Sequence, residues 1–205
     1  MSAKVAVYFY STYGHMHRMA QAAVEGVKEA GAEAVLLRVP ETLPPDVLKM
    51  LGATEAQKAF EGVKPAKLEE FGDYDGYVFA TPTRFGVVPA QFKTFLDATG
   101  QVWAKGGLVD KPVGIMTSSG MQHGGQEATI LGLIPYVLHH GALYVGLPLT
   151  SGVLGGTDEV SGNSFYGAST IAGGDGSRMP SANELAGAKF QGKRVAELAT
   201  RLKAK

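Results

Sequence analysis

Short apolar runs, each ending in a polar loop that contains glycine, constrain the fold of this chain more than any other feature. The first run, residues 4–10 (KVAVYFY), is rich in β-branched and aromatic residues and is followed by S-T-Y-G. Such a run is typical of a strand buried on both faces. Apolar residues then recur at helical spacing from Met16 to Val27, and Gly31 ends the pattern. The chain is therefore predicted to begin with a strand, a tight loop and a helix.

Later apolar runs and helical patterns extend this alternation. Strands are predicted at residues 33–39, 76–81, 112–118 and about 142–147, and helices at about 89–98 and 126–140. Strands that alternate with helices form a parallel sheet, so the sequence predicts an α/β fold. A last helix follows Ser181 and Glu184, whose S-x-x-E spacing is that of a capping box.

Two stretches, 40–75 and 148–180, are longer than ordinary loops. T-E-A-Q at 54–57 offers a second capping box, so the first stretch is expected to contain short helices. The second stretch is rich in glycine, serine and threonine, and we expect it to serve a functional site or an assembly. We interpret residues 1–205 as one domain that carries these two insertions.

The chain has no cysteine and a balanced charge, with 19 basic and 19 acidic residues. Disulfides, thiolate metal sites and thiol nucleophiles are thereby excluded, and redox chemistry would require a bound cofactor. The net charge does not indicate a nucleic acid or an anionic membrane as a partner. The first apolar run is too short to span a bilayer. We expect a cytoplasmic protein without a nucleic-acid partner or membrane insertion.

Three loops after predicted strands form the candidate site, at residues 11–16, 81–86 and 118–127. In a parallel sheet such loops converge outside the carboxyl ends of the strands, where ligands bind. The first loop, S-T-Y-G-H-M, precedes a helix whose N-terminus attracts anions, so a phosphate is a suitable ligand. For this loop alone, an ordinary turn with a hydroxyl cap is the alternative. Neither G-x-G-x-x-G nor G-x-x-x-x-G-K-[ST] occurs in it, which argues against a dinucleotide or P-loop site.

Aromatic and charged residues near these loops suit a planar ligand. Phe85 and Trp103 offer apolar faces and Arg84 offers a cation. Each aromatic residue taken alone is better explained as core, but that interpretation does not explain the polar residues interleaved with them. His139 and His140 end a predicted helix, where a positive charge interacts favourably with the helix dipole. They are not a metal pair, because adjacent helical residues point about 100° apart. No metal site is predicted.

Two further patterns limit the chemistry and the shape of this region. Pro135 lies four residues before His139 and is expected to kink or split the helix. No G-x-S-x-G elbow is present, so Ser118 and Ser119 are poor candidates for a hydrolase nucleophile.

Segments along nearly the whole chain carry a family resemblance. They are Y-S-T-Y-G-H at 10–15, R-V-P-E-T at 38–42, T-P-T-R-F-G at 81–86, F-L-D-A-T-G at 95–100, G-G-Q-E at 124–127, H-H-G at 139–141 and Y-G-A-S-T-I-A-G-G-D-G-S-R-M-P-S at 166–181. With them the chain resembles the WrbA family of flavodoxin-like NAD(P)H:quinone oxidoreductases. The resemblance implies a five-stranded parallel sheet of order 2-1-3-4-5 with helices on both faces. It also implies FMN as cofactor, NADH or NADPH as co-substrate, a quinone substrate, and a homotetramer whose subunit contacts help to close the active site.

The resemblance also assigns site residues. It places the FMN phosphate end at Ser11, Thr12, Tyr13, Gly14, His15 and Met16. It places the isoalloxazine edge at Thr83, Arg84, Phe85, Ser118, Ser119, Gly120, Met121, Gln122, His123, Gly124 and Gly125, with His139 reaching the same site. Tyr13 is expected to meet the nicotinamide and Trp103 to line the quinone pocket. The 118–127 loop is one residue longer than the common family form, and Val87 stands where the family often has Asn.

The function expected from these assignments is two-electron transfer from NAD(P)H to quinones by a ping-pong mechanism, with the protein supplying orientation. No residue is required as acid or base, and His139 and Tyr13 are the candidate proton donors. Two alternatives are a flavodoxin-type one-electron carrier and a regulatory binding module. The neutral charge argues against the acidic docking surface of a carrier, and the lack of a helix-turn-helix pattern argues against DNA contact.

Overall fold

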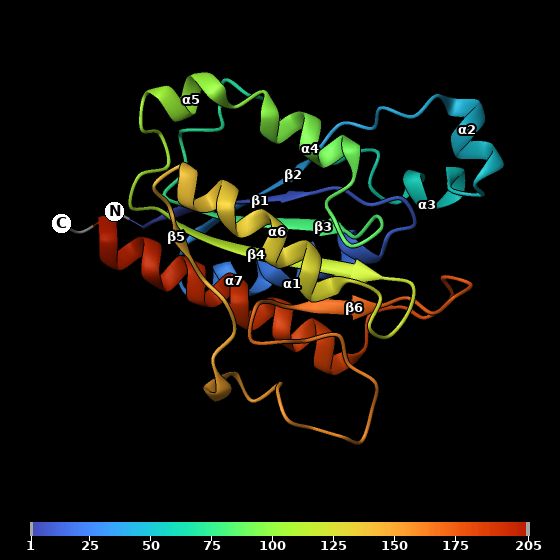
Figure 1. Cartoon of the computed structure of the whole chain (residues 1–205). Coiled ribbons are helices and arrows are strands. Elements are labelled where there is room, and N and C mark those ends of the chain that lie inside the picture. The colour runs from blue at the N-terminus through green and yellow to red at the C-terminus, as the bar shows by residue number, and fades with distance from the viewer. Residues whose placement is uncertain (1, 204–205) are drawn as a thin grey trace.

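A computed structural model describes residues 2–203, in which a parallel sheet lies between two layers of helices (Figure 1). The strands are β1 (Lys4–Phe9), β2 (Glu33–Arg38), β3 (Gly76–Pro82), β4 (Pro112–Ser119), β5 (Leu143–Tyr144) and β6 (Ser169–Ile171). The order across the sheet is β2-β1-β3-β4-β5, and β6 pairs with β4. These pairings are parallel, so the predicted α/β class and strand order are confirmed.

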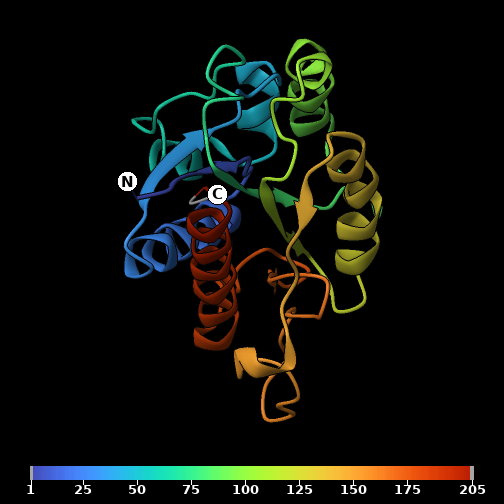
Figure 2. The same cartoon turned by 90° about the vertical axis from the view of Figure 1, so that its left-hand side faces the viewer.

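Helices cover both faces of the sheet, as Figure 2 shows from the side. One face is covered by α1 (His15–Glu29) and α7 (Ala182–Lys203), which pack against each other along their length. The other face is covered by α4 (Ala90–Asp97), α5 (Gly100–Ala104) and α6 (Gln126–His139). The first insertion holds α2 (Pro45–Met50) and α3 (Thr54–Lys58), and the second holds the 3-10 turn η1 (Leu149–Ser151).

β1 lies inside the sheet and is buried on both faces. Val5, Val7 and Phe9 pack with the α1 and α7 layer, whereas Ala6 and Tyr8 pack on the opposite side. All five side chains are fully buried. The unbroken apolar run therefore forms a strand with two buried faces, as predicted.

The edge of the sheet beside β4 is divided between two short strands. Leu143 of β5 pairs with Pro112 at the start of β4, and Ser169 of β6 pairs with Thr117 near its end. The chain leaves the sheet between them. The fifth strand is thus shorter than the predicted 142–147 run. The sequence does not predict β6, because three residues in a glycine-rich stretch form no apolar run.

Two helix predictions need correction. Thr54 does not cap α3, since the N-cap residue is Ala53 and no side-chain cap bond forms there. α6 is not split at Pro135, which lies inside the helix on its exposed side. Pro135 cannot donate to the carbonyl of residue 131, and Leu131 is exposed, so water can take the place of that donor. The predicted capping box of Ser181 and Glu184 is confirmed.

No helix within residues 2–203 combines the length and apolar character needed to cross a membrane.

Candidate cofactor site

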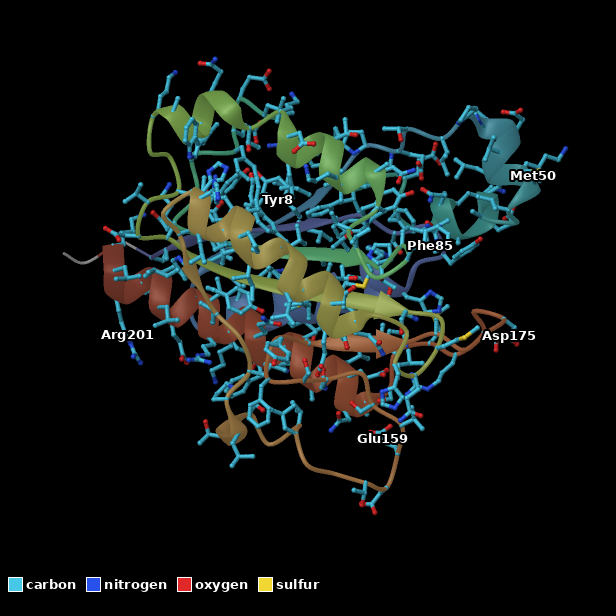
Figure 3. All side chains as sticks on the ribbon, viewed as in Figure 1. Tyr8, Met50, Phe85, Glu159, Asp175 and Arg201 are labelled. Atoms are coloured by element: carbon cyan, nitrogen blue, oxygen red, sulfur yellow. The ribbon has the colours of Figure 1, made fainter. Side chains whose placement is uncertain are left out.

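The carboxyl ends of β1, β3 and β4 open into a cavity of about 350 Å³. Its walls are Ser11, Thr12, Tyr13, His15, Pro82, Thr83, Arg84, Ser118, Ser119, Gly120, Ala172, Gly173, Gly174, Asp175 and Gly176. Figure 3 shows Phe85 and Asp175 at this end of the molecule and Arg201 at the opposite end. The structure thus brings residues of all three predicted loops together, and a fourth segment joins them.

The loop after β1 places unpaired polar atoms beside the start of α1. Gly14 adopts a left-handed conformation with φ of 94°, and its N–H donates to Ser11 Oγ at 3.0 Å. α1 then begins at His15, and its first turn has no acidic residue. Thr12 Oγ1 and His15 Nε2 are buried and have no hydrogen-bond partner among the described residues. A helix N-terminus with two unpaired polar atoms beside it suits a phosphate group.

The first insertion holds this loop from behind. The amide Nε2 of Gln57 in α3 donates to the backbone carbonyls of Ser11 at 3.0 Å and Thr12 at 3.2 Å. The hydroxyl of Tyr13 donates to the carbonyl of Leu51 at 3.3 Å. Two loop carbonyls are thereby bonded to the insertion, which reduces the number of electron-rich groups that would face an anion.

The loop after β3 is a tight turn that is tied to its neighbours. The N–H of Thr83 donates to the carbonyl of Ser118 at 2.8 Å, and Thr83 Oγ1 accepts bonds from the N–H of Gly86 and from Thr129 Oγ1. Phe85 at the turn has φ of 54° and a fully exposed side chain. The alternative that Phe85 belongs to the core is therefore wrong.

The two halves of the loop after β4 line different hollows. Ser118 and Ser119 are buried at the cavity, and Ser119 Oγ donates to the carbonyl of Met121 at 2.6 Å. The side chain of Met121 is exposed. Gln122 and His123 line a separate hollow beside residues 161–164. Neither residue lines the cavity of its own chain, so the structure of one chain does not support their predicted contact with the flavin.

Glycines close this loop against the loop after β3. Gly125 has φ of 95° and precedes α6, and a Cβ atom there would lie 2.8 Å from Cα of Gly86. Gly124 is similarly confined, since a Cβ would lie 2.6 Å from the carbonyl oxygen of Met121. These glycines bring the two loops together but do not themselves line the cavity.

The fourth wall, Ala172–Gly176, was not assigned to the site from the sequence, although it falls inside the most specific family segment. It follows β6, whose strand is too short to show as an apolar run. Its sequence, G-G-D-G after T-I-A, is a polar loop with glycine after β-branched residues, like the three predicted loops. That similarity could have identified it as part of the site.

Gly14 and Phe85 lie on the predicted loops but do not line this cavity, and three other predicted residues are also outside its lining. The side chain of Met16 is fully buried in the core beneath α1, so only its backbone N–H is suited to a phosphate. Trp103 and His139 lie at the C-terminal end of α6, whereas the cavity lies near its start. A helix of 14 residues spans about 20 Å, which separates both residues from the cavity of their own chain.

The two histidines at the end of α6 have different environments. His140 is buried and its Nε2 lies 3.3 Å from Thr99 Oγ1, whereas His139 is exposed. Burial lowers the pKa of His140, and the neighbouring His139 charge lowers it further. The two adjacent imidazoles therefore lie in different surroundings, one inside the protein and one at its surface. Within the described part of the chain, no group of three His, Asp or Glu residues is arranged to hold a metal ion.

Two titratable residues of the cavity wall, His15 and Asp175, have shifted pKa values. Burial lowers the pKa of His15, while the backbone carbonyls of Arg178 and Gly176 and the charge of Glu184 oppose that shift. Asp175 also lies on the wall, and its Oδ1 accepts bonds from the N–H and the hydroxyl of Ser177. The bond from the Ser177 N–H holds the pKa of Asp175 below its usual value. The Asp175 carboxylate is thereby bonded within its own loop.

Comparisons with known proteins extend over nearly the whole chain. Residues 10–149 match the family described as NADPH-dependent FMN reductase. An NAD(P)H dehydrogenase (quinone) from Geobacter metallireducens is 56% identical over 201 residues, which cover 98% of this chain and 99% of that protein. A protein of the same name from Solidesulfovibrio magneticus is 54% identical with the same coverage.

Among solved structures, a WrbA-like flavodoxin from Agrobacterium tumefaciens has a TM-score of 0.66 and 26% identity, and the match covers 98% of this chain and 99% of that one. Flavodoxin 1 from Bacillus cereus, at 14% identity and a TM-score of 0.59, shares the fold, with 94% and 97% of the two chains covered. The expected flavodoxin-like fold is confirmed. The chain belongs to the NADPH-dependent FMN reductase family and, within it, to the WrbA-like quinone oxidoreductases.

Proposed function

We propose that this chain binds FMN in the cavity and transfers two electrons from NAD(P)H to quinones by a ping-pong mechanism. The observation that carries the proposal is the pair of buried, unpartnered polar atoms, Thr12 Oγ1 and His15 Nε2, at the N-terminus of α1. Both atoms are suited to bond a phosphate oxygen there. The names of the relatives support the same cofactor and substrates.

The rest of the cavity suits the flavin ring. Thr83, Arg84 and the 118–120 segment would hold its polar edge, since they line the wall that continues from the phosphate loop. Bound FMN would supply the chemistry, accepting hydride from NAD(P)H and passing two electrons to a quinone. Tyr13, which lines the cavity, and Phe85, which is exposed on the turn next to the cavity residue Arg84, would orient flat substrates by stacking. One open mouth serves both substrates in turn, which favours ping-pong kinetics.

Two side chains are candidates for supplying a proton to the quinone product. Tyr13 lines the cavity, and its hydroxyl donates to the carbonyl of Leu51. His139 would reach the site only from another copy of the chain, because it lies at the far end of α6. Each would act as a general acid within hydrogen-bond reach of the substrate.

We also propose a homotetramer in which one copy covers the cavity of another. Exposed apolar side chains gather on the outer side of α6, at Leu131 and Leu138, and Trp103 lies beside the end of that helix. Such a surface is suited to contact another copy. In this arrangement Trp103 and His139 of one subunit would complete the quinone pocket of its neighbour.

Anaerobic stopped-flow absorbance of the FMN-loaded protein tests the function. Addition of NADH or NADPH should bleach the visible flavin band, and benzoquinone should restore it fully in one step. The faster nucleotide identifies the preferred co-substrate. Bound FMN that is not bleached would replace the enzyme with an electron carrier, and a protein that binds no FMN would refute the proposed site.

A further inference from the structure

A buried carboxylate joins three separate segments near the cavity. The side chain of Glu184, in the first turn of α7, is fully buried. Its Oε1 accepts bonds from the N–H groups of Gly162 and Ile171, both at 3.1 Å. Its Oε2 accepts bonds from Thr170 Oγ1 at 2.8 Å and from the N–H of Ser181 at 2.8 Å. The last of these is the capping-box bond, so Glu184 does more than a capping residue requires.

Arg178 completes the charge balance and extends the network. Its Nη1 lies 2.9 Å from Glu184 Oε2 and 2.6 Å from the carbonyl oxygen of Ile171. Its Nη2 donates to the carbonyl of Val160 at 2.8 Å, and its backbone N–H donates to the carbonyl of Ala172 at 2.9 Å. The loop between Ala172 and Arg178 is thereby fixed at both ends.

This loop is the fourth wall of the cavity. Residues 172–176 line the cavity, and the carbonyls of Gly176 and Arg178 lie beside the ring of His15 in the phosphate loop. A shift of the loop would therefore move the wall against which His15 is placed. Among the described residues, Thr83 and Arg84 form no hydrogen bond with Glu184 or Arg178, so their end of the cavity would be less affected.

We propose that the Glu184–Arg178 ion pair is a positioning device that sets this wall and the orientation of His15, and so determines the affinity for the phosphate group of FMN. The inference deepens the proposed function and rests on it. A buried carboxylate with donors from three segments loses little by staying charged, but its removal would leave those donors unpaired in the protein interior. Neither residue lines the cavity, so both would act through the 172–178 loop.

Affinity measurements with FMN and riboflavin, which lacks the phosphate, separate positioning from general stability. Glu184→Gln keeps the size of the side chain but removes its charge. It also places an NH2 group against the N–H and O–H donors that now bond to the carboxylate. We expect its FMN affinity, measured by quenching of flavin fluorescence, to fall about tenfold. Riboflavin affinity should change by less than about twofold, because the ring end of the cavity is unaltered.

Gln191→Met is the matched control. Gln191 is also fully buried in α7 and bonds the N–H of Ala168 and the carbonyl of Val145, but neither partner lines the cavity. Gln191→Met should lower thermal stability without changing the ratio of FMN affinity to riboflavin affinity. Arg178→Lys, which keeps a positive charge beside Glu184 but loses the planar fork, should show a smaller shift of that ratio in the same direction as Glu184→Gln.

The outcomes are distinct. Equal losses of FMN and riboflavin affinity in Glu184→Gln, or a lower melting temperature with both affinities unchanged, would overturn the positioning role. If Glu184→Gln does not fold, an unchanged affinity ratio in Arg178→Lys would overturn it. A wild-type chain that binds neither flavin would refute the proposed function itself, whatever the variants do.

Discussion

The indole Nε1 of Trp103 donates a hydrogen bond to the backbone carbonyl of His139 at 2.8 Å, at the end of the sheet opposite to the cavity. The family resemblance assigns both residues to the active site, yet they meet each other rather than the cavity of their own chain. Their proximity means that a single contact between subunits would deliver both to a neighbouring cavity. The proposed assembly can therefore be tested at Trp103.

Trp103→Ala should lower kcat/KM for quinones by about tenfold, because it removes a large aromatic face from the pocket. FMN affinity should stay unchanged, since the cavity of the same chain does not contain this residue. Trp103→Phe, which keeps an aromatic face and loses only the bond to His139, should recover most of the activity. Light scattering would report the subunit number, and a fully active monomer would refute the shared pocket.

Gln57→Leu should weaken FMN binding about five- to tenfold, because two loop carbonyls lose their donor and turn toward the phosphate site. Glu55→Ala on the same short helix is the control. Glu55 is exposed and pairs only with Lys58 among the described residues, so its loss should change FMN affinity little. Isothermal titration of both apoproteins would measure the difference. Equal affinities would show that the insertion does not position the loop.

Phe85→Asn should raise the free energy of unfolding by up to about 1 kcal/mol, because asparagine tolerates the left-handed backbone conformation better than phenylalanine. The exposed ring makes no packing contribution that the variant would lose. The same change should weaken binding of flat substrates, measured as a higher KM for both nicotinamide and quinone. A less stable variant would contradict the account of strain at this turn.

The apoprotein should lose stability as the pH falls below about 6.5, the ordinary pKa of histidine. Burial lowers the pKa of His15, His17 and His140. Below about pH 6.5 the unfolded chain therefore binds more protons than the folded chain, and acid favours unfolding. His17 is enclosed by the rings of Phe9 and Phe60, with centroids 5.1 and 5.2 Å away. Urea midpoints at pH 7.5 and 5.5 would measure the loss.

His17→Leu should reduce this pH dependence, because an apolar side chain in the same pocket takes up no proton. The exposed His123, replaced by Asn, is the control and should leave the slope unchanged. A midpoint that rises on acidification in the wild type would contradict the sign of the linkage.

Much of the fold could be predicted because its strands are buried on both faces. The run from Val5 to Phe9 is apolar or aromatic throughout, and residues 76–80 and 112–116 of β3 and β4 are likewise apolar, aromatic or glycine. β6 lies at an edge and contains two polar residues that the Glu184 network and neighbouring loops satisfy. Such a strand depends on tertiary bonds, which leave no periodic pattern in the sequence.

The loops of the candidate site could be predicted from the sequence, whereas the positions of several single side chains could not. Loops directly after long strands, such as the one at Ser11 and the one at Thr83, have a fixed place at the sheet edge, and the structure brings both to the cavity. The positions of Trp103 and His139 depend on which end of a helix they occupy, and a motif does not reveal whether a residue serves its own chain or another. Likewise, Gln57 resembled a capping residue, but its amide bonds to a loop 45 residues away.

The divided sheet edge also bears on how the chain could be reordered. Each half of that edge has its own pairing with β4, and residues 155–160 between the halves are exposed. Ser2 and Lys203 lie close together, with Lys203 Nζ 3.5 Å from the carbonyl oxygen of Ser2. A circular permutant with a short linker joining the old termini and new termini at Gly155 would therefore keep every strand pairing intact, with the C-terminal wall of the cavity now synthesised first.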